Sequence, residues 1–335
     1  MKFQTLDNCI GTVLASDITD DNNRLILKSG IVLTEKIINR LRNFGIYCIG
    51  VEDPISQDID VTQPVSNKTM IEAASIYTNQ NSIDVDKAFS IAEKLVDEIT
   101  CNNSAMSNGL QIIKVYDENT SLHSINVAIL AIMFGYNLGL NITKLNNLAV
   151  GGLLHDIGKT KVPIEILNKT DKLTPEEFEE IKKHPQYGWD ILSEDILMPA
   201  TIKAIVYQHH ENWDGTGYPR HLENYNVYEL AAIVHICDVF DALISKRSYK
   251  SAFKYSDTIQ YIQSQSGKMF SPYYTKYFFK FVPIFHTGTD VILSNNEKAI
   301  IVKNNLGDMT RPTVRLYSNM EEINLTQRKD LSIIS

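Results

Sequence analysis

Apolar residues recur with helical spacing through the middle of the chain. Between residues 83 and 99 they follow one another at three- and four-residue intervals, and His123 begins a second face of the same kind. Such spacing gathers apolar side chains on one side of a helix. The pattern continues to about Phe281, so we expect a helical domain over residues 69–282.

One helix start is marked with particular clarity. Thr174, Pro175 and two glutamates ending at Glu177 stand in consecutive positions. A capping hydroxyl, a proline in the first turn and carboxylates at the positive end all favour a helix there. This helix leads towards His184, and a second start is predicted at Ser256.

The first part of the chain has a different pattern, in which short apolar runs alternate with turn signals. Residues 10–18 and 24–28 are predicted as strands, Thr34 as the N-cap of a helix, and residues 46–51 as a further strand. We expect a small α+β unit over residues 1–55.

Residues 56–68 are polar and lack periodicity, which predicts a linker. Residues 283–335 return to short apolar runs, at 291–293, 299–302 and 313–316, and predict a small β unit for which a barrel-like form is one alternative. The predicted fold class is therefore mainly α, an all-helical domain with a small unit at each end.

Composition restricts the classes of function. The chain has 335 residues, 44% of them hydrophobic and 21% charged, as in soluble globular proteins. A net charge of −8 argues against a general binder of nucleic-acid polymers, which needs a basic surface. A small anionic ligand in a local basic pocket is still compatible with that charge.

The four cysteines, Cys9, Cys48, Cys101 and Cys237, are scattered without CxxC spacing, which favours free thiols in a reducing compartment. The first residues lack the apolar core of a signal peptide. The longest apolar stretch, residues 127–140, is too short to span a bilayer. We expect a cytoplasmic protein without a membrane span.

Candidate chemistry is concentrated in the helical region. Five of the eight histidines fall between His123 and His210, and His155 is followed directly by Asp156. Imidazole binds Zn, Fe, Mn or Ni, and one carboxylate can bridge two ions. Two metals about 3.5–4 Å apart can activate water and neutralise charge on a phosphate. The alternative is that each histidine is a separate core or surface residue.

Six motifs occur in a fixed order. They are Gly-Leu-Leu-His-Asp-Ile-Gly-Lys at 152–159, His184-Pro185, His209-His210-Glu211, Asp-Gly-Thr-Gly-Tyr-Pro at 214–219, Asp-Val-Phe-Asp-Ala-Leu at 238–243, and Arg-Ser-Tyr-Lys at 247–250. In these motifs the chain resembles the HD-GYP family, bacterial phosphodiesterases of the HD superfamily that hydrolyse cyclic di-GMP. The resemblance covers about residues 105–282.

The resemblance implies two metal ions with a shared carboxylate. One ion would be surrounded by His123, His155, Asp156 and Asp238, and Asp156 would bridge to a second held by His184, His209 and His210. Adjacent His209 and His210 point about 100° apart on a helix, so they can share an ion only near a helix end. The family implies iron or manganese, although an imidazole-rich site would also accept zinc or nickel.

Lys159 is the predicted catalytic partner of Asp156, as a cation that contacts the scissile phosphate. It would face the same way as His155 if the helix continued, which Gly158 leaves open. The alternative is a solvated lysine at a helix end.

For Gly217 and Tyr218 the resemblance implies a loop that bounds the substrate pocket, with Tyr218 touching the nucleotide. The alternative is a tight turn. Asp214 is included with the substrate residues, although a structural role is also open. Arg247 and Lys250 could present cations to phosphate or guanine, or form a solvent-facing basic pair.

Three positions depart from or qualify the family pattern. Some members have a glutamate four residues before the first histidine ligand, whereas this chain has Asn119 there and Glu118 one residue earlier. Two metals, with pGpG as product, are therefore preferred over three metals and GMP. His235 is expected to be a packed core residue, with an approach to the site from one turn before Asp238 as the alternative. Asp241 either orients a ligand or caps a turn.

The expected function is a metal-dependent phosphodiesterase that opens cyclic di-GMP to pGpG, with onward hydrolysis to GMP left open. One alternative is a module that binds or senses cyclic di-GMP with little turnover. Another is a phosphodiesterase for cyclic GMP-AMP. The resemblance further implies a regulatory role or a role in homodimerisation for the N-terminal unit.

Overall fold

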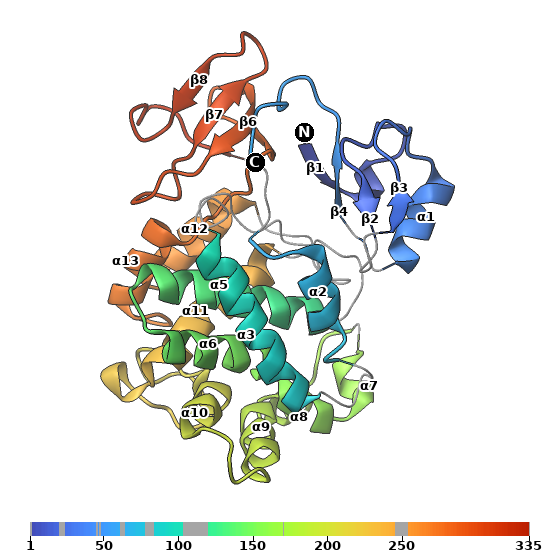
Figure 1. Cartoon of the computed structure of the whole chain (residues 1–335). Coiled ribbons are helices and arrows are strands. Elements are labelled where there is room, and N and C mark those ends of the chain that lie inside the picture. The colour runs from blue at the N-terminus through green and yellow to red at the C-terminus, as the bar shows by residue number, and fades with distance from the viewer. Residues whose placement is uncertain are drawn as a thin grey trace. The chain divides into compact units, whose positions relative to one another are not determined.

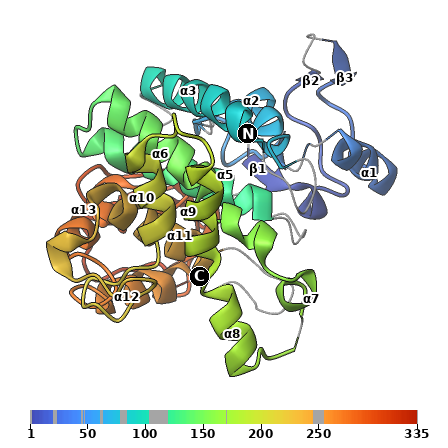
Figure 2. The same ribbon diagram turned by 90° about the horizontal axis from the view of Figure 1, so that it is seen from below.

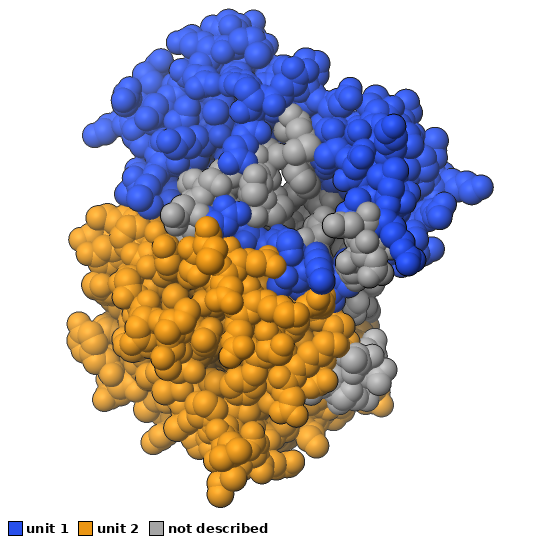
Figure 3. Space-filling view, in the orientation of Figure 1, with its two compact units in different colours: residues 1–71, 102–115, 283–335 blue, residues 72–101, 116–282 orange. Residues whose placement is uncertain are grey.

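The computed structural model describes residues 2–19, 24–44, 46, 48–60, 64–77, 84–102, 120–169, 171–244 and 254–334. The chain divides into two compact units, which Figure 3 shows in blue and orange. Unit 1 contains residues 1–71 and 283–335, and unit 2 contains residues 72–101 and 116–282.

Unit 2 is built from helices, as the periodicity predicts (Figures 1 and 2). They are α3 (Val85–Cys101), α5 (Thr120–Asn137), α6 (Ile142–Leu154), the 3-10 helix η2 (Ile157–Lys161), α7 (Ile164–Leu167), α8 (Pro175–Ile181), α9 (His184–Ser193), α10 (Ala200–Gln208), η3 (Asn224–Asn226), α11 (Glu229–Ile244), α12 (Tyr255–Ser264) and α13 (Pro272–Phe281). A further helix, α2 (Asn67–Ala74), precedes them in the chain.

The predicted capping signals are confirmed where they bear on the site. Thr174 accepts a hydrogen bond from the Glu177 main-chain nitrogen, and the Glu177 carboxylate accepts one from the Thr174 nitrogen, so α8 begins with a complete capping box. Helix α12 begins at Tyr255 with Lys254 as its N-cap, one residue earlier than predicted.

Helix α5 is the central helix of unit 2. Its residues from Ile125 to Phe134 are buried on every side, and it contacts α3, α6, α11 and α13. A helix that is apolar all round must be enclosed by other helices. Helix α5 therefore holds His123 in the interior of the domain.

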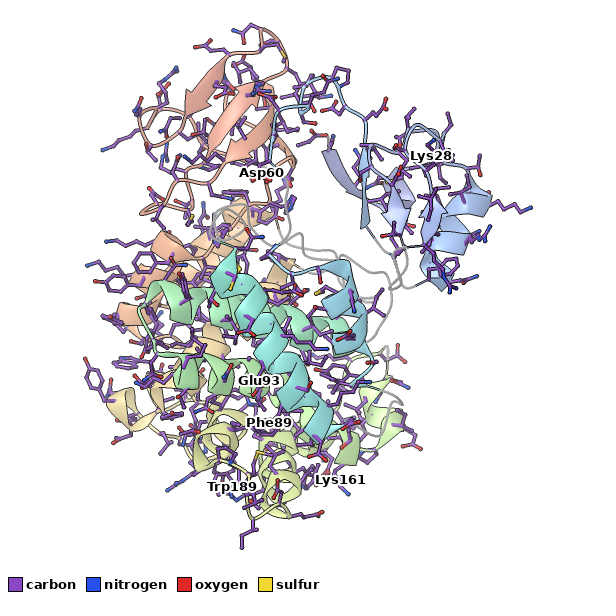
Figure 4. All side chains as sticks on the ribbon, viewed as in Figure 1. Lys28, Asp60, Phe89, Glu93, Lys161 and Trp189 are labelled. Carbon is purple, nitrogen blue, oxygen red and sulfur yellow. The ribbon has the colours of Figure 1, made fainter. Side chains whose placement is uncertain are left out.

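Helices α9 and α10 pack side by side through an aromatic contact. Trp189 of α9, labelled in Figure 4, lies 5.2 Å from Tyr207 of α10 between ring centroids. The Lys203 ammonium lies 5.7 Å from the Trp189 ring centroid. This contact holds together the two helices that carry His184 and His209.

The N-terminal part of unit 1 is α+β, and two of its three predicted strands, 24–28 and 46–51, coincide with observed strands. The observed strands are β1 (Lys2–Thr5), β2 (Ile18–Thr19), β3 (Leu25–Leu27) and β4 (Cys48–Val51), with α1 (Glu35–Asn43) before β4. The strand predicted over residues 10–18 is wrong for most of its length, since only isolated bridges at Val13 and Leu14 precede β2. Thr34 does cap α1, as predicted.

The C-terminal part of unit 1 is an antiparallel meander in the order β5-β6-β7-β8. Its strands are β5 (Asp290–Ile292), β6 (Lys298–Lys303), β7 (Thr313–Leu316) and β8 (Glu322–Asn324). Strands β5, β6 and β7 coincide with the predicted apolar runs, and β8 was not predicted. Among the described strands no pairing joins β8 to β5, so the sheet is open there.

Part of the segment predicted as a linker packs on this sheet. Arg315 of β7 donates to both carboxylate oxygens of Asp58, each at 2.7 Å, and to the Ile55 carbonyl. Ile59 is buried against Ile300 of β6. Residues 55–59 are therefore anchored within unit 1, which the polar composition of 56–68 does not indicate.

No helix in the described part of the chain has both the length and the apolar character that crossing a bilayer requires.

Candidate metal centre

Asp156 lies where α6 gives way to η2, directly after the C-cap residue His155. At Gly158 an added Cβ would lie 1.9 Å from the His184 carbonyl oxygen and 2.5 Å from the Gly188 nitrogen. Only glycine lets η2 lie this close to the α9 backbone. The close approach brings Asp156 beside His184.

Two groups of side chains offer metal ligands, and within each group the ligand atoms lie within 4.8 Å of one another. The four-residue group contains Asp156, His184, His209 and His210, and the three-residue group contains His123, His155 and Asp238. These are the seven residues of the expected ligand set, contributed by α5, α9, α11 and the ends of α6 and α10.

The two oxygens of Asp156 face different groups. Oδ1 lies 3.3 Å from Nε2 of His184 and 3.9 Å from Nε2 of His209. Oδ2 lies 3.3 Å from Nε2 of His155, which belongs to the three-residue group. A carboxylate that bridges two ions needs this orientation.

Three of the histidines are oriented by the main chain. His155, His184 and His209 each have Nδ1 2.8 Å from the carbonyl oxygen three residues earlier. The ring therefore donates through Nδ1 and turns Nε2, with its lone pair, towards the centre. Such hydrogen bonds commonly hold the tautomer and orientation of metal-binding histidines.

His123 is oriented by a carboxylate instead. Its Nδ1 lies 2.7 Å from Asp241 and its Nε2 lies 2.9 Å from Asp238. Asn126 donates to the other Asp241 oxygen at 3.0 Å, and Asp241 is completely buried. Asp241 therefore lies where it orients the ring of His123.

The electrostatics of the four-residue group favour neutral imidazoles around an ionised carboxylate, whereas for His123 burial is outweighed by the hydrogen bonds to Asp238 and Asp241, which raise the pKa to about 9. Burial lowers the pKa of His184 to about 4 and that of His209 and His210 well below the usual value. Burial alone would raise the pKa of Asp156, but the Lys159 ammonium and His155 hold it well below its ordinary range. Metal ligands must be in these protonation states.

A profile described as HD domain matches residues 100–273, more than half of the chain. The chain belongs to the HD-domain family. Its relatives place it in the HD-GYP type of that family.

Several relatives of this HD-GYP chain are phosphodiesterases. A cyclic di-GMP phosphodiesterase of Pseudomonas aeruginosa is 34% identical over 68% of this chain and 55% of its own length. One of Thermotoga maritima is 33% identical over 61% of this chain and 57% of its own length. The chain thus spans little more than half the length of these relatives.

A solved structure supports the fold. An HD-GYP-type protein of Bdellovibrio bacteriovorus superposes with a TM-score of 0.52 and 20% identity, covering 82% of this chain and 97% of its own. At that identity the likeness concerns the fold alone.

The donor set of this HD-GYP chain fits the metal dependence of HD-domain phosphodiesterases. Nε2 of His155 and Oδ1 of Asp156 are buried and have no hydrogen-bond partner among the described residues. An unsatisfied buried polar atom lowers stability, and a cation would satisfy both atoms. Imidazole and carboxylate donors suit first-row divalent metals.

Lys159 lies at the edge of the centre. Its Nζ is 2.5 Å from Oδ2 of Asp156, and its side chain is 30% exposed. The α-helix does not continue to Lys159, because the chain tightens into η2 after Asp156. The turn still directs the ammonium to the Asp156 carboxylate.

The loop after His210 places Tyr218 against the centre. The Tyr218 ring stacks on the His210 ring, with centroids 4.8 Å apart and planes at 28°. At Gly217 an added Cβ would lie 2.1 Å from the Asn212 nitrogen, so glycine is required there. Asp214 accepts hydrogen bonds from the nitrogen and hydroxyl of Thr216, a local turn that matches its structural alternative.

Two residues near the centre had no role predicted from the sequence, although Glu211 belongs to one of the six motifs. Glu211 is buried and accepts hydrogen bonds from the main-chain nitrogens of Arg220, at 2.6 Å, and Leu222, at 2.9 Å. It thereby ties the two ends of the loop that contains Tyr218. Lys182 has its ammonium 5.9 Å from the Tyr218 ring centroid. For Glu211 the only signal was its position after the paired histidines.

Four positions that the sequence singled out, Glu118, Asn119, Arg247 and Lys250, lie outside the described residues.

Proposed function

We propose that this HD-GYP chain is a metal-dependent phosphodiesterase that hydrolyses cyclic di-GMP. The observation that carries the proposal is the orientation of Asp156, whose two oxygens face the four-residue and the three-residue group. A single carboxylate between two sets of histidines suits two ions that act on one phosphate. The relatives named as cyclic di-GMP phosphodiesterases support this substrate.

We assign the four-residue group to one ion and the three-residue group to the other, with Asp156 shared. When bound, two divalent cations supply stabilisation of phosphate charge and a lowered pKa for a nearby water. The histidines hold Nε2 lone pairs ready for this task, because their Nδ1 atoms are already committed to the protein.

Lys159 and Tyr218 are proposed to contact the substrate. Lys159 has a partly exposed ammonium beside Asp156, where it can offset charge on the scissile phosphate. Tyr218 presents a half-buried ring stacked on His210, which bounds the site on the side of the loop. Gly217 and the Glu211 carboxylate hold that loop in place, and Arg247 and Lys250 are proposed as further cations for phosphate or guanine.

We propose iron or manganese as the metal, with zinc and nickel as alternatives that the same donors would accept. The proposed product is linear pGpG. This choice depends on Asn119, which occupies the position where a third metal would need a carboxylate.

The experiment is a time course of the metal-loaded full chain with cyclic di-GMP, in which pGpG and GMP are separated. Replacing Asp156 by Asn keeps the shape and removes the charge that both groups share. We expect turnover to fall by more than about 100-fold. Losing a residue that only supports a metal ligand usually costs about 100-fold at most. Bound metal should fall with it.

Asp190→Asn is the matched control, since Asp190 is an exposed residue of α9 whose side chain, within the described part of the chain, bonds only to Gln186. It should retain parental metal content and turnover. Parental hydrolysis by the Asp156 variant would refute the proposal. Binding of metal and cyclic di-GMP by the unaltered chain without any product would instead support a binding module.

Cyclic GMP-AMP is the second candidate substrate. A 3′3′-cGAMP-specific phosphodiesterase of Vibrio cholerae is 33% identical over 53% of this chain and 34% of its own length. Running both dinucleotides at equal concentration decides between them. A higher kcat/KM for cyclic GMP-AMP would replace cyclic di-GMP as the assignment.

We further propose that residues 69–282 form the catalytic domain, that residues 1–55 form a regulatory or dimerising unit connected through residues 56–68, and that residues 283–335 form an accessory β unit. The anchoring of Asp58 by Arg315 supports joint movement of the 55–59 segment and the C-terminal sheet.

A further inference from the structure

His235 is a buried histidine beside the metal centre that the proposed reaction does not use. It lies on α11, one turn before Asp238, and only 3% of its surface is exposed. One ring nitrogen faces the His209 main-chain carbonyl, and neither makes a hydrogen bond of good geometry within the described residues. Burying unsatisfied polar atoms costs folding free energy, so a partner is expected for at least one of them.

The ring of His235 lies between Phe270 and the centre. Phe270 packs on it at 5.1 Å between centroids, and His210 lies 6.3 Å away with the two ring planes at 83°. Phe270 offers no hydrogen bond. The His209 carbonyl can take one ring N–H of His235, so a partner for the other nitrogen is to be sought on the side that faces His210.

His210 differs from the other histidines of the two groups. His155, His184 and His209 donate through Nδ1 to the main chain, and His123 to a carboxylate. Among the described residues His210 makes no comparable hydrogen bond. Its ring is held only by stacking on Tyr218 and by contact with neighbouring imidazoles.

His210 and His235 are therefore complementary. A metal-binding histidine almost always donates its second ring N–H to a carboxylate, a carbonyl or a water. One water with hydrogen bonds of about 2.8 Å spans two nitrogens up to about 5.6 Å apart. With ring centroids 6.3 Å apart, nitrogens that are turned towards each other lie within that reach. Such a water would also satisfy a nitrogen of His235.

We propose that His235 is a positioning residue that orients His210 through a bridging water and thereby sets the metal affinity of the four-residue group. The inference rests on the proposed function, since it assumes that His210 binds a metal. The proposed water acts on the four-residue group, because it bridges to His210 and not to a residue of the three-residue group.

The test is a titration of the metal-free full chain with Mn²⁺ alone, followed by equilibrium dialysis. His235→Phe keeps an aromatic ring without nitrogens, and His235→Ala removes the ring without adding volume. In both we expect one of the two sites to weaken by about 10–100-fold, the usual effect of losing a supporting hydrogen bond, and the other to be unchanged.

Two further variants separate hydrogen bonding from packing. His235→Gln retains a donor and an acceptor and should recover most of the lost affinity. Phe270→Leu disturbs the opposite side of the His235 ring without touching its nitrogens, and should bind two Mn²⁺ ions with parental affinity. Loss of one site in Phe270→Leu equal to that in His235→Ala would assign the effect to packing and overturn the proposal.

The outcomes separate this inference from the proposed function. An unaltered chain that binds no Mn²⁺ refutes both. An unaltered chain that binds two ions, together with a folded His235→Ala or His235→Phe variant of equal affinity at both sites, refutes the role of His235 alone.

Discussion

Replacing Gly158 by alanine tests whether the contact between η2 and α9 places Asp156 beside His184. The new Cβ would lie 1.9 Å from the His184 carbonyl oxygen and 2.5 Å from the Gly188 nitrogen. Both are backbone atoms, so the turn and the helix must separate by about 1.5 Å to reach 3.4 Å, where ordinary contact begins. Oδ1 of Asp156 and Nε2 of His184, now 3.3 Å apart, would move with them.

Two effects of different size are expected. Overpacking of this kind costs about 1–3 kcal/mol, which for a domain of this size lowers Tm by about 2–12 °C. Misplacement of a catalytic group by 1 Å can cost about 100-fold in rate. The variant should therefore remain folded at 25 °C while turnover of cyclic di-GMP falls about 100-fold or more.

The assay combines thermal unfolding, Mn²⁺ titration and turnover. Gly135→Ala is the control, because its Cβ would meet only side-chain atoms of Leu148, Leu145 and Leu140, which can shift. It should lose stability while keeping metal affinity and rate. If Gly158→Ala bound two ions with parental affinity and kept its rate within about threefold, the reasoning would be refuted.

Two other predictions concern charge. Asp241→Asn weakens the carboxylate contact that orients His123, so a Mn²⁺ titration should show about 10–100-fold lower affinity at the three-residue group alone; equal loss at both groups would contradict this. Burial lowers the pKa of His286 to about 4, whereas an unfolded histidine titrates near about 6.5. As the pH falls through this window the unfolded chain binds the proton first, so the free energy of unfolding should drop by up to about 1.4 kcal/mol per pH unit. The free energy of unfolding is measured by urea denaturation at pH 7.5 and 5.0. Between these pH values it should fall less in His286→Gln than in the parent chain, and an equal fall in both would refute the prediction.

Local signals predicted the helices well and the N-terminal strands only in part, since β3 and β4 fall within predicted strands while β1 was not predicted. The capping box at Thr174 acts within four residues, so its outcome does not depend on the rest of the chain. Strand β1 pairs with β4 through contacts such as Lys2 with Val51. A strand so far from its partner has no local pattern that specifies it.

The candidate site shows the same division. Adjacent His209 and His210 were predicted to share an ion only near a helix end, and α10 does end at Gln208. Lys159 was uncertain because Gly158 interrupts the helix, and the 3-10 turn decides its direction. Glu211 was not recognised, because its partners, the main-chain nitrogens of Arg220 and Leu222, are not apparent from residue types.

The sequence by itself determined which donors this chain possesses, their order and their chemical preference for divalent metals. These are properties of side-chain type and near-neighbour spacing. Only the tertiary structure decided that the oxygens of Asp156 face two different groups and that Asp241 orients His123. It also decided that His235 lies next to His210, whose ring makes no hydrogen bond within the described part of the chain. Those relations join helices far apart in the chain, and packing around Gly158 and α5, not local propensity, sets their distances.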